Sequence, residues 1–125
     1  MHIKAKQKLL IVDDAVENLD VLDAMLRDEY RVQAARNGTV ALKLANAPEP
    51  PDLILLDIVM PDMDGFAVCR ELKANAATRD IPVIFISALD DVFDKVHAFR
   101  MGGVDFITKP FHVEEVLARV RVHLT

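Results

Sequence analysis

The sequence predicts an α/β protein with a doubly wound, five-stranded parallel sheet and helices on both faces. Short apolar runs alternate with amphipathic stretches along the whole chain, which is the pattern of repeated β-α units. Three of the runs are continuously apolar, as expected for strands that are buried on both faces. The length of 125 residues is typical of one domain, so residues 1–125 are expected to form a single domain.

The expected strands fall into a central and an edge group. Continuous apolar runs predict central strands, whereas runs that alternate with polar residues, or are short and end at a proline, suit the edges. The central runs are Leu9 to Val12, Leu53 to Leu56 and Val83 to Ile86, and the edge runs are Arg31 to Ala34 and Phe106 to Thr108. Right-handed crossovers then give the flavodoxin-like strand order 2-1-3-4-5.

Helices are expected between these strands, because apolar residues recur there at helical spacing and share one face. In chain order the faces are Leu19, Leu22 and Leu26; Ala41, Leu44 and Ala45; Gly65, Val68, Cys69 and Leu72; Val92, Val96 and Phe99; and Val113, Val116, Leu117, Val120 and Leu124. Pro48 and Gly102-Gly103 mark stops, and Asp64 and Asp90 or Asp91 are candidate caps for the helices that follow them.

Charge and composition disfavour several classes of function. The formal net charge is -5, which argues against direct nucleic-acid binding and against an anionic membrane surface. The apolar run after the basic N-terminal segment is too short for a signal peptide or a membrane span, so a cytoplasmic location is expected. The single cysteine, Cys69, has no partner for an internal disulfide and is expected to be a small buried side chain.

Acidic residues follow two neighbouring strands at the point where the strand order reverses. Asp13 and Asp14 come after the first strand, and Asp57 comes after the third. Because ligands bind at the carboxyl ends of strands beside such a point, we expect the three carboxylates to converge on one crevice. A divalent cation such as Mg2+ would relieve their repulsion. The alternative is that one or more of these acids only caps a helix or a turn.

Two further polar residues end the remaining strands of this half of the sheet. Ser87 ends the fourth strand, and Lys109 follows the fifth, so a hydroxyl and an ammonium are expected to point into the same crevice. A carboxylate nucleophile, a metal, a donor hydroxyl and a cation are the groups needed to form and hold an acyl phosphate. By itself, each of these residues is an ordinary surface residue.

The chain resembles the receiver domain of two-component response regulators over essentially its whole length. The resemblance rests on Leu9 to Asp14, Leu55 to Pro61 with Asp64-Gly65, Ile86 to Ala88, and Lys109 to Phe111. It implies that Asp57 is the phosphoacceptor and that a histidine kinase or phosphotransfer protein donates the phosphoryl group. Such a domain catalyses only its own phosphorylation and dephosphorylation and controls a downstream output domain or protein, so this chain can be one domain of a longer protein.

The resemblance also implies roles for the other residues of the crevice. Asp14, Asp57 and the backbone carbonyl of Val59 would bind Mg2+ directly, and Asp13 would help through water. The hydroxyl of Ser87 and the ammonium of Lys109 would contact the phosphoryl group. In the family, the peptide bond before the proline that Pro110 matches is commonly cis.

A switch and a readout surface follow from the same resemblance. Phe106 matches the aromatic switch position, and Ser87 is the hydroxyl that moves with it; simple packing of Phe106 on an edge strand is the structural alternative, and both can hold at once. The implied readout face comprises the helix Asp91 to Met101, the fifth strand and the helix Val113 to Leu124. A homodimer would form through this same face.

Two positions near the acceptor predict a long phosphorylated lifetime. Val59 and Leu89 lie two residues beyond Asp57 and Ser87, where polar side chains in this family can orient the hydrolytic water. Both are apolar in this chain, so neither can position water by a hydrogen bond. We therefore expect slow loss of the phosphoryl group.

Other functions fit the sequence less well. An aspartate-nucleophile phosphatase would carry a second acid at the position of Val59. An FMN carrier would need a hydroxyl- and glycine-rich loop after the first strand, where the sequence is Asp13-Asp14-Ala15. A module that only binds, without being phosphorylated, would not need the complete set of crevice residues.

Overall fold

The computed structural model describes residues 6–88 and 92–124. In this part of the chain five strands alternate with five helices. In order they are β1 (Lys8–Val12), α1 (Val16–Leu26), β2 (Arg31–Ala35), α2 (Gly38–Ala45), β3 (Leu53–Asp57), α3 (Gly65–Ala74), β4 (Val83–Ser87), α4 (Val92–Arg100), β5 (Asp105–Thr108) and α5 (Val113–Leu124).

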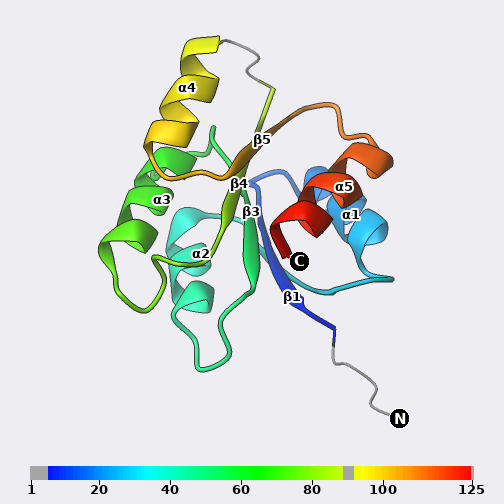
Figure 1. Ribbon diagram of the computed structural model, residues 1–125, viewed down its shortest axis with the longest axis horizontal. Coiled ribbons are helices and arrows are strands. Elements are labelled where there is room, and N and C mark those ends of the chain that lie inside the picture. The colour runs from blue at the N-terminus through cyan, green and yellow to red at the C-terminus, as the bar shows by residue number, and fades with distance from the viewer. Residues whose placement is uncertain (1–5, 89–91, 125) are drawn as a thin grey trace.

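All strand pairs are parallel, and the sheet has the order β2-β1-β3-β4-β5. Helices α1 and α5 cover one face, and α2, α3 and α4 cover the other (Figure 1). The predicted doubly wound sheet and its order are therefore confirmed. The point where the order reverses lies between β1 and β3.

The three central strands are buried along their whole length, as their continuous apolar sequences predicted. Successive residues of β1 serve opposite faces of the sheet: Leu10 and Val12 belong to the core under α2 and α3, and Leu9 and Ile11 belong to the core under α1 and α5. Because each central strand fills two cores, the strand ends beside the reversal point are held firmly in place.

Helix α4 turns a different face to the protein from the one its apolar spacing predicted. Val96 and Phe99 do share a face, but they are 42% and 51% exposed, whereas Ala98 is 1% exposed. Ala98 belongs to the same core cluster as Phe85. The Gly103 N–H, just after the helix, donates to the Ala98 carbonyl at 3.0 Å, and a Cβ on Gly103 would lie 2.6 Å from the Phe85 ring. Helical spacing identifies an apolar stripe, but it does not show whether the stripe meets the core or solvent.

The other helix expectations are largely met. The Asp64 side chain accepts a hydrogen bond from the Ala67 N–H at 2.8 Å and so caps α3. Cys69 is buried. Val113 is exposed although it belonged to the predicted apolar face of α5, and Asp90 and Asp91 lie outside the described residues. No helix among the described residues is both long and apolar enough to cross a membrane.

Candidate functional site

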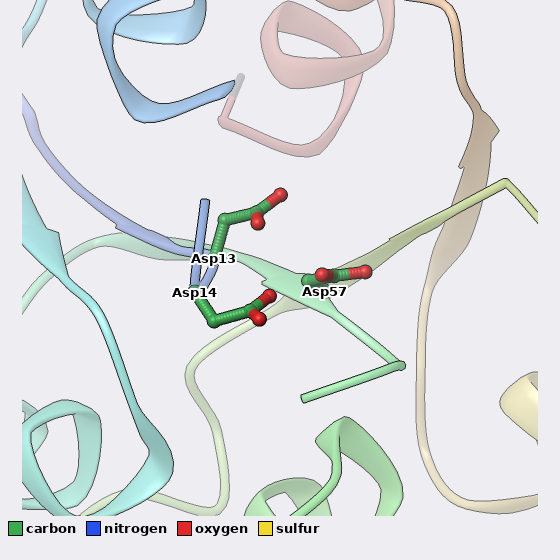
Figure 2. Close-up of side chains that lie close together, drawn as sticks. All are labelled: Asp13, Asp14 and Asp57. Atoms are coloured by element: carbon green, nitrogen blue, oxygen red, sulfur yellow. The ribbon is translucent and has the colours of Figure 1, made fainter. Parts of the chain in front are cut away.

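The three acidic residues meet at the carboxyl ends of β1 and β3, as the strand order predicted. Figure 2 shows Asp13, Asp14 and Asp57 gathered at this edge of the sheet, and one carboxylate oxygen from each lies within 4.8 Å of the others. The register that pairs Val12 with Leu56 brings the two strand ends level. Asp13 and Asp57 are buried, whereas Asp14 is exposed.

Lys109 supplies the positive charge next to these acids. Its Nζ lies 3.0 Å from Oδ2 of Asp13 and 3.4 Å from Oδ2 of Asp57. The backbone N–H of Lys109 donates to the Ser87 carbonyl at 2.9 Å, which ties the end of β5 to the end of β4. The peptide bond between Lys109 and Pro110 is cis, as the resemblance to receiver domains implied.

The surroundings of Asp57 raise its pKa, which makes ionisation harder than for a carboxyl group in water. Burial raises the pKa of Asp57, the negative charge of Asp13 raises it further, and the net pKa is about 6. The Lys109 ammonium and the Val59 N–H lower the pKa of Asp57 but do not outweigh those effects. One lysine is therefore not enough to neutralise the acids, and a cation of higher charge would be accommodated.

A cleft of about 350 Å³ opens over these residues. It is lined by Asp13, Asp14, Ala15, Asn18, Asp57, Val59, Ser87, Ala88 and Lys109. The predicted carboxylates, hydroxyl and ammonium thus share one cavity. The Val59 side chain, which is 60% exposed, offers no hydrogen-bonding group there, and Leu89 lies outside the described residues.

Phe106 of β5 lies in the core on the α2, α3 and α4 face. It is 7% exposed, and the Nζ of Lys95 on α4 lies 5.8 Å from the centre of its ring. An ammonium at that distance from an aromatic face is attracted by the ring. The packed aromatic expected from the sequence is therefore present, and it contacts the helix of the predicted readout face.

The sequence patterns predicted no chemical role for two residues that the structure places at the site. The Asn18 side-chain amide donates to Oδ2 of Asp13 at 3.1 Å. Gly65 packs so tightly that a Cβ at this position would lie 2.3 Å from the backbone oxygen of Asp57, so only glycine leaves the acceptor strand undisturbed. Gly65 could have been found from its place in the family pattern, whereas nothing in the local sequence distinguishes Asn18 from a solvent-facing helix residue.

The donor atoms at this edge suit a hard divalent cation. Mg2+ prefers carboxylate, carbonyl and water oxygens, and Asp13, Asp14 and Asp57 offer carboxylate oxygens within 4.8 Å of one another. Burial raises the pKa of Asp57 and the negative charge of Asp13 adds to this effect, so a bound cation would favour the ionised carboxylate. The residues present therefore fit Mg2+.

Comparison with known proteins identifies similar sequences over most of this chain. Residues 9–121 match the family model described as the response regulator receiver domain. The chain is 47% identical over 115 residues to the response regulator PleD of Caulobacter vibrioides, covering 91% of this chain and 25% of PleD. It is 43% identical over 118 residues to the DNA-binding dual master transcriptional regulator RpaA of Synechocystis, covering 94% of this chain and 48% of RpaA. The chain thus spans only a quarter to a half of these relatives.

A solved structure matches the fold of this chain. It is the receiver domain of a sensor histidine kinase from Pseudomonas aeruginosa PAO1, determined with a magnesium ion coordinated in the active site cleft. The TM-score is 0.87 at 31% sequence identity, and the match covers 96% of this chain and 98% of the other. The similarity therefore extends over nearly the whole of both chains.

Proposed function

This chain belongs to the response regulator receiver domain family of two-component systems, and on that premise we propose that Asp57 is its phosphoacceptor. One observation carries the proposal. The Asp57 carboxylate is buried at the end of β3, 3.4 Å from the Lys109 ammonium, and opens into a cleft that it shares with Asp13 and Asp14. Asp57 thus combines access to the cleft with a neighbouring cation, at the position that matches the family's phosphoacceptor.

The reaction we propose is transfer of a phosphoryl group from a donor histidine to Asp57. A carboxylate oxygen of Asp57 attacks phosphorus in line, and a carboxyl phosphate forms as the phosphorus–nitrogen bond breaks. The electron pair of that bond stays on the imidazole, which takes up a proton. The Lys109 ammonium and the Ser87 hydroxyl stabilise the negative charge on the phosphoryl oxygens. The donor is the phosphohistidine of a histidine kinase or a phosphotransfer protein.

The acids have a second task, which is to hold Mg2+. Asp14, Asp57 and the Val59 carbonyl would hold the ion directly, and Asp13 would help through water. When bound, the ion supplies positive charge that offsets both the carboxylates and the phosphoryl oxygens. Ionised Asp57 is then the favoured form, which is the form that acts as nucleophile.

In this proposal, phosphorylation of Asp57 changes the positions of side chains on β4 and β5. Phosphorylation adds about one to two negative charges at Asp57, which draws the Ser87 hydroxyl and Lys109 toward the new oxygens. Movement of Ser87 makes room for Phe106, which changes the packing of α4 and β5. The exposed apolar side chains on α4, Val96 and Phe99, lie on the readout face that a downstream output domain, a partner protein or a second copy of this chain covers.

The experiment that tests this function uses phosphoramidate as a small phosphoryl donor. In the presence of Mg2+, the mass of the intact protein is expected to rise by one phosphoryl group, and Asp57→Asn is expected to abolish the gain. Asp62→Asn is the matched control, because Asp62 is an exposed acid in the following loop that does not line the cleft. The assignment is wrong if the wild-type protein gains no mass, or if the gain persists in Asp57→Asn.

A further inference from the structure

Asp13 differs from its two acidic neighbours in how completely protein donors engage it. Its Oδ1 accepts a hydrogen bond from the Ala15 N–H at 2.9 Å. Its Oδ2 receives the Asn18 amide at 3.1 Å and the Lys109 ammonium at 3.0 Å. Because Asp13 is 1% exposed, bulk water does not compete for these positions, and the carboxylate is held in one orientation.

Asp14 presents the opposite case. It is exposed, and within residues 6–88 and 92–124 no side chain or backbone donor bonds to its carboxylate. Its oxygens therefore remain available to a ligand. The two adjacent acids thus differ: hydrogen bonds fix Asp13, whereas Asp14 is open to the cleft.

Asn18 is the residue of this arrangement that has no other evident task. It lies in the first turn of α1, whose N-cap residue, Ala15, has no side chain that can cap the helix. Asparagine is a poor helix former because its side chain competes for backbone groups, yet this side chain points back to Asp13 and lines the cleft. Its amide shares the Asp13 oxygen with Lys109, which also contacts Asp57.

We infer that Asn18 is a positioning residue for the cation site: its neutral amide fixes Asp13 beside Lys109 without adding charge, and so leaves Asp14 and Asp57 to supply the carboxylate ligands. This inference rests on the proposed function, in which these acids hold Mg2+. Without the amide, Lys109 is the one described donor left on Oδ2 of Asp13, and the carboxylate is held by two donors in place of three. Loss of a group that orients a ligand set commonly weakens metal binding by about 10- to 100-fold.

The test measures Mg2+ affinity of the unphosphorylated protein by isothermal titration calorimetry. Asn18→Leu keeps a similar size and removes the amide donor, and it is expected to weaken Mg2+ binding by roughly tenfold. Val21→Leu introduces the same residue on the exposed side of the same helix and is expected to leave the affinity unchanged. Asn18→Gln retains an amide and is expected to bind Mg2+ more tightly than Asn18→Leu.

A second measurement separates positioning from a purely structural role. Unfolding by urea in EDTA reports the stability of each metal-free variant. If Asn18 only anchored α1, Asn18→Leu would lower this stability while the folded protein bound Mg2+ with wild-type affinity, and that result overturns the inference. If Asn18→Leu does not fold, Asn18→Ala carries the same comparison. Failure of the wild-type protein to bind Mg2+ would instead overturn the metal site of the proposed function.

Discussion

Ionisation of the buried Asp57 carboxyl is needed for its proposed reaction, but the same ionisation destabilises the folded protein. A nucleophile in a preorganised cleft must be ionised to react, but burial and the charge of Asp13 raise the pKa of Asp57 to about 6. For an acid, a folded-state pKa above the unfolded value means that ionisation destabilises the folded state. The metal-free domain therefore loses stability as the pH rises through this range.

Replacing Asp57 with asparagine is expected to stabilise the metal-free protein at neutral pH. The expected gain is about 1 to 2 kcal/mol, less than the value of about 1.4 kcal/mol per pKa unit would give, because the open cleft lets water screen the charge. The advantage is absent below pH about 4, where the acid is protonated in both states, and complete above the folded pKa of about 6. Urea unfolding in EDTA across this pH range measures it, and an Asp57→Asn variant no more stable than wild type at neutral pH contradicts it.

Val59 and Leu89 govern the lifetime of the phosphorylated state in our proposal. The double variant Val59→Asn, Leu89→Glu supplies groups that can orient water, so phosphate is expected to be lost roughly tenfold faster or more. The half-exposed position of Val59 allows the change without disturbing the core. Decay is followed by intact mass after removal of phosphoramidate, with Val21→Asn as a control outside the cleft. Equal or slower decay in the double variant would contradict the proposal that apolar residues at these positions slow the loss of the phosphoryl group.

At the scale of elements, α4 shows how a helix can satisfy an apolar pattern while exposing it. Among its described side chains, Ala98 is buried, Lys95 lies over the Phe106 ring, and the His97 ring meets Phe66 edge-on with centroids 4.5 Å apart. Phe66 in turn packs against Phe85 of β4, with ring centroids 5.3 Å apart. The exposed stripe of Val96 and Phe99 is consequently left for another surface.

Substitutions on the two sides of α4 are expected to show which side packs against the protein and which faces solvent. Val96→Ser and Phe99→Ser are expected to change the free energy of unfolding by no more than about 0.5 kcal/mol, because both side chains face solvent. Ala98→Leu is expected to destabilise the domain by about 1 to 3 kcal/mol through overpacking against β4. Chemical denaturation of the three variants measures both. A large loss from Val96→Ser with little from Ala98→Leu would mean that the helix faces the other way.

At the scale of the whole molecule, the cation site couples ligand binding to folding. The three acids come from two strands that are far apart in sequence, so the site exists only in the folded domain. A ligand that binds only the folded state stabilises it according to its concentration relative to Kd. In our proposal, Mg2+ bound at one edge of the sheet would thus stabilise the whole domain.

Mg2+ is therefore expected to raise the unfolding free energy of the wild-type protein. At ten times Kd the gain is about 1.4 kcal/mol, measured by urea unfolding with and without the ion. Asp14→Asn is expected to lose most of this gain, because it removes the acid that is open to the cleft, whereas Asp62→Asn is expected to keep it. The same gain in Asp14→Asn as in the wild type would show that the ion binds elsewhere.

The sequence by itself determined the sheet order and the meeting of Asp13, Asp14, Asp57, Ser87 and Lys109 at one edge. Both follow from local patterns, since continuous apolar runs identify buried strands and parallel strands bring their carboxyl ends to the same edge. The tertiary structure alone decided that α4 exposes Val96 and Phe99 and that Asn18 bonds to Asp13. Those features depend on how closely the backbones of distant segments approach one another, and the spacing of residue types along the chain does not specify that distance.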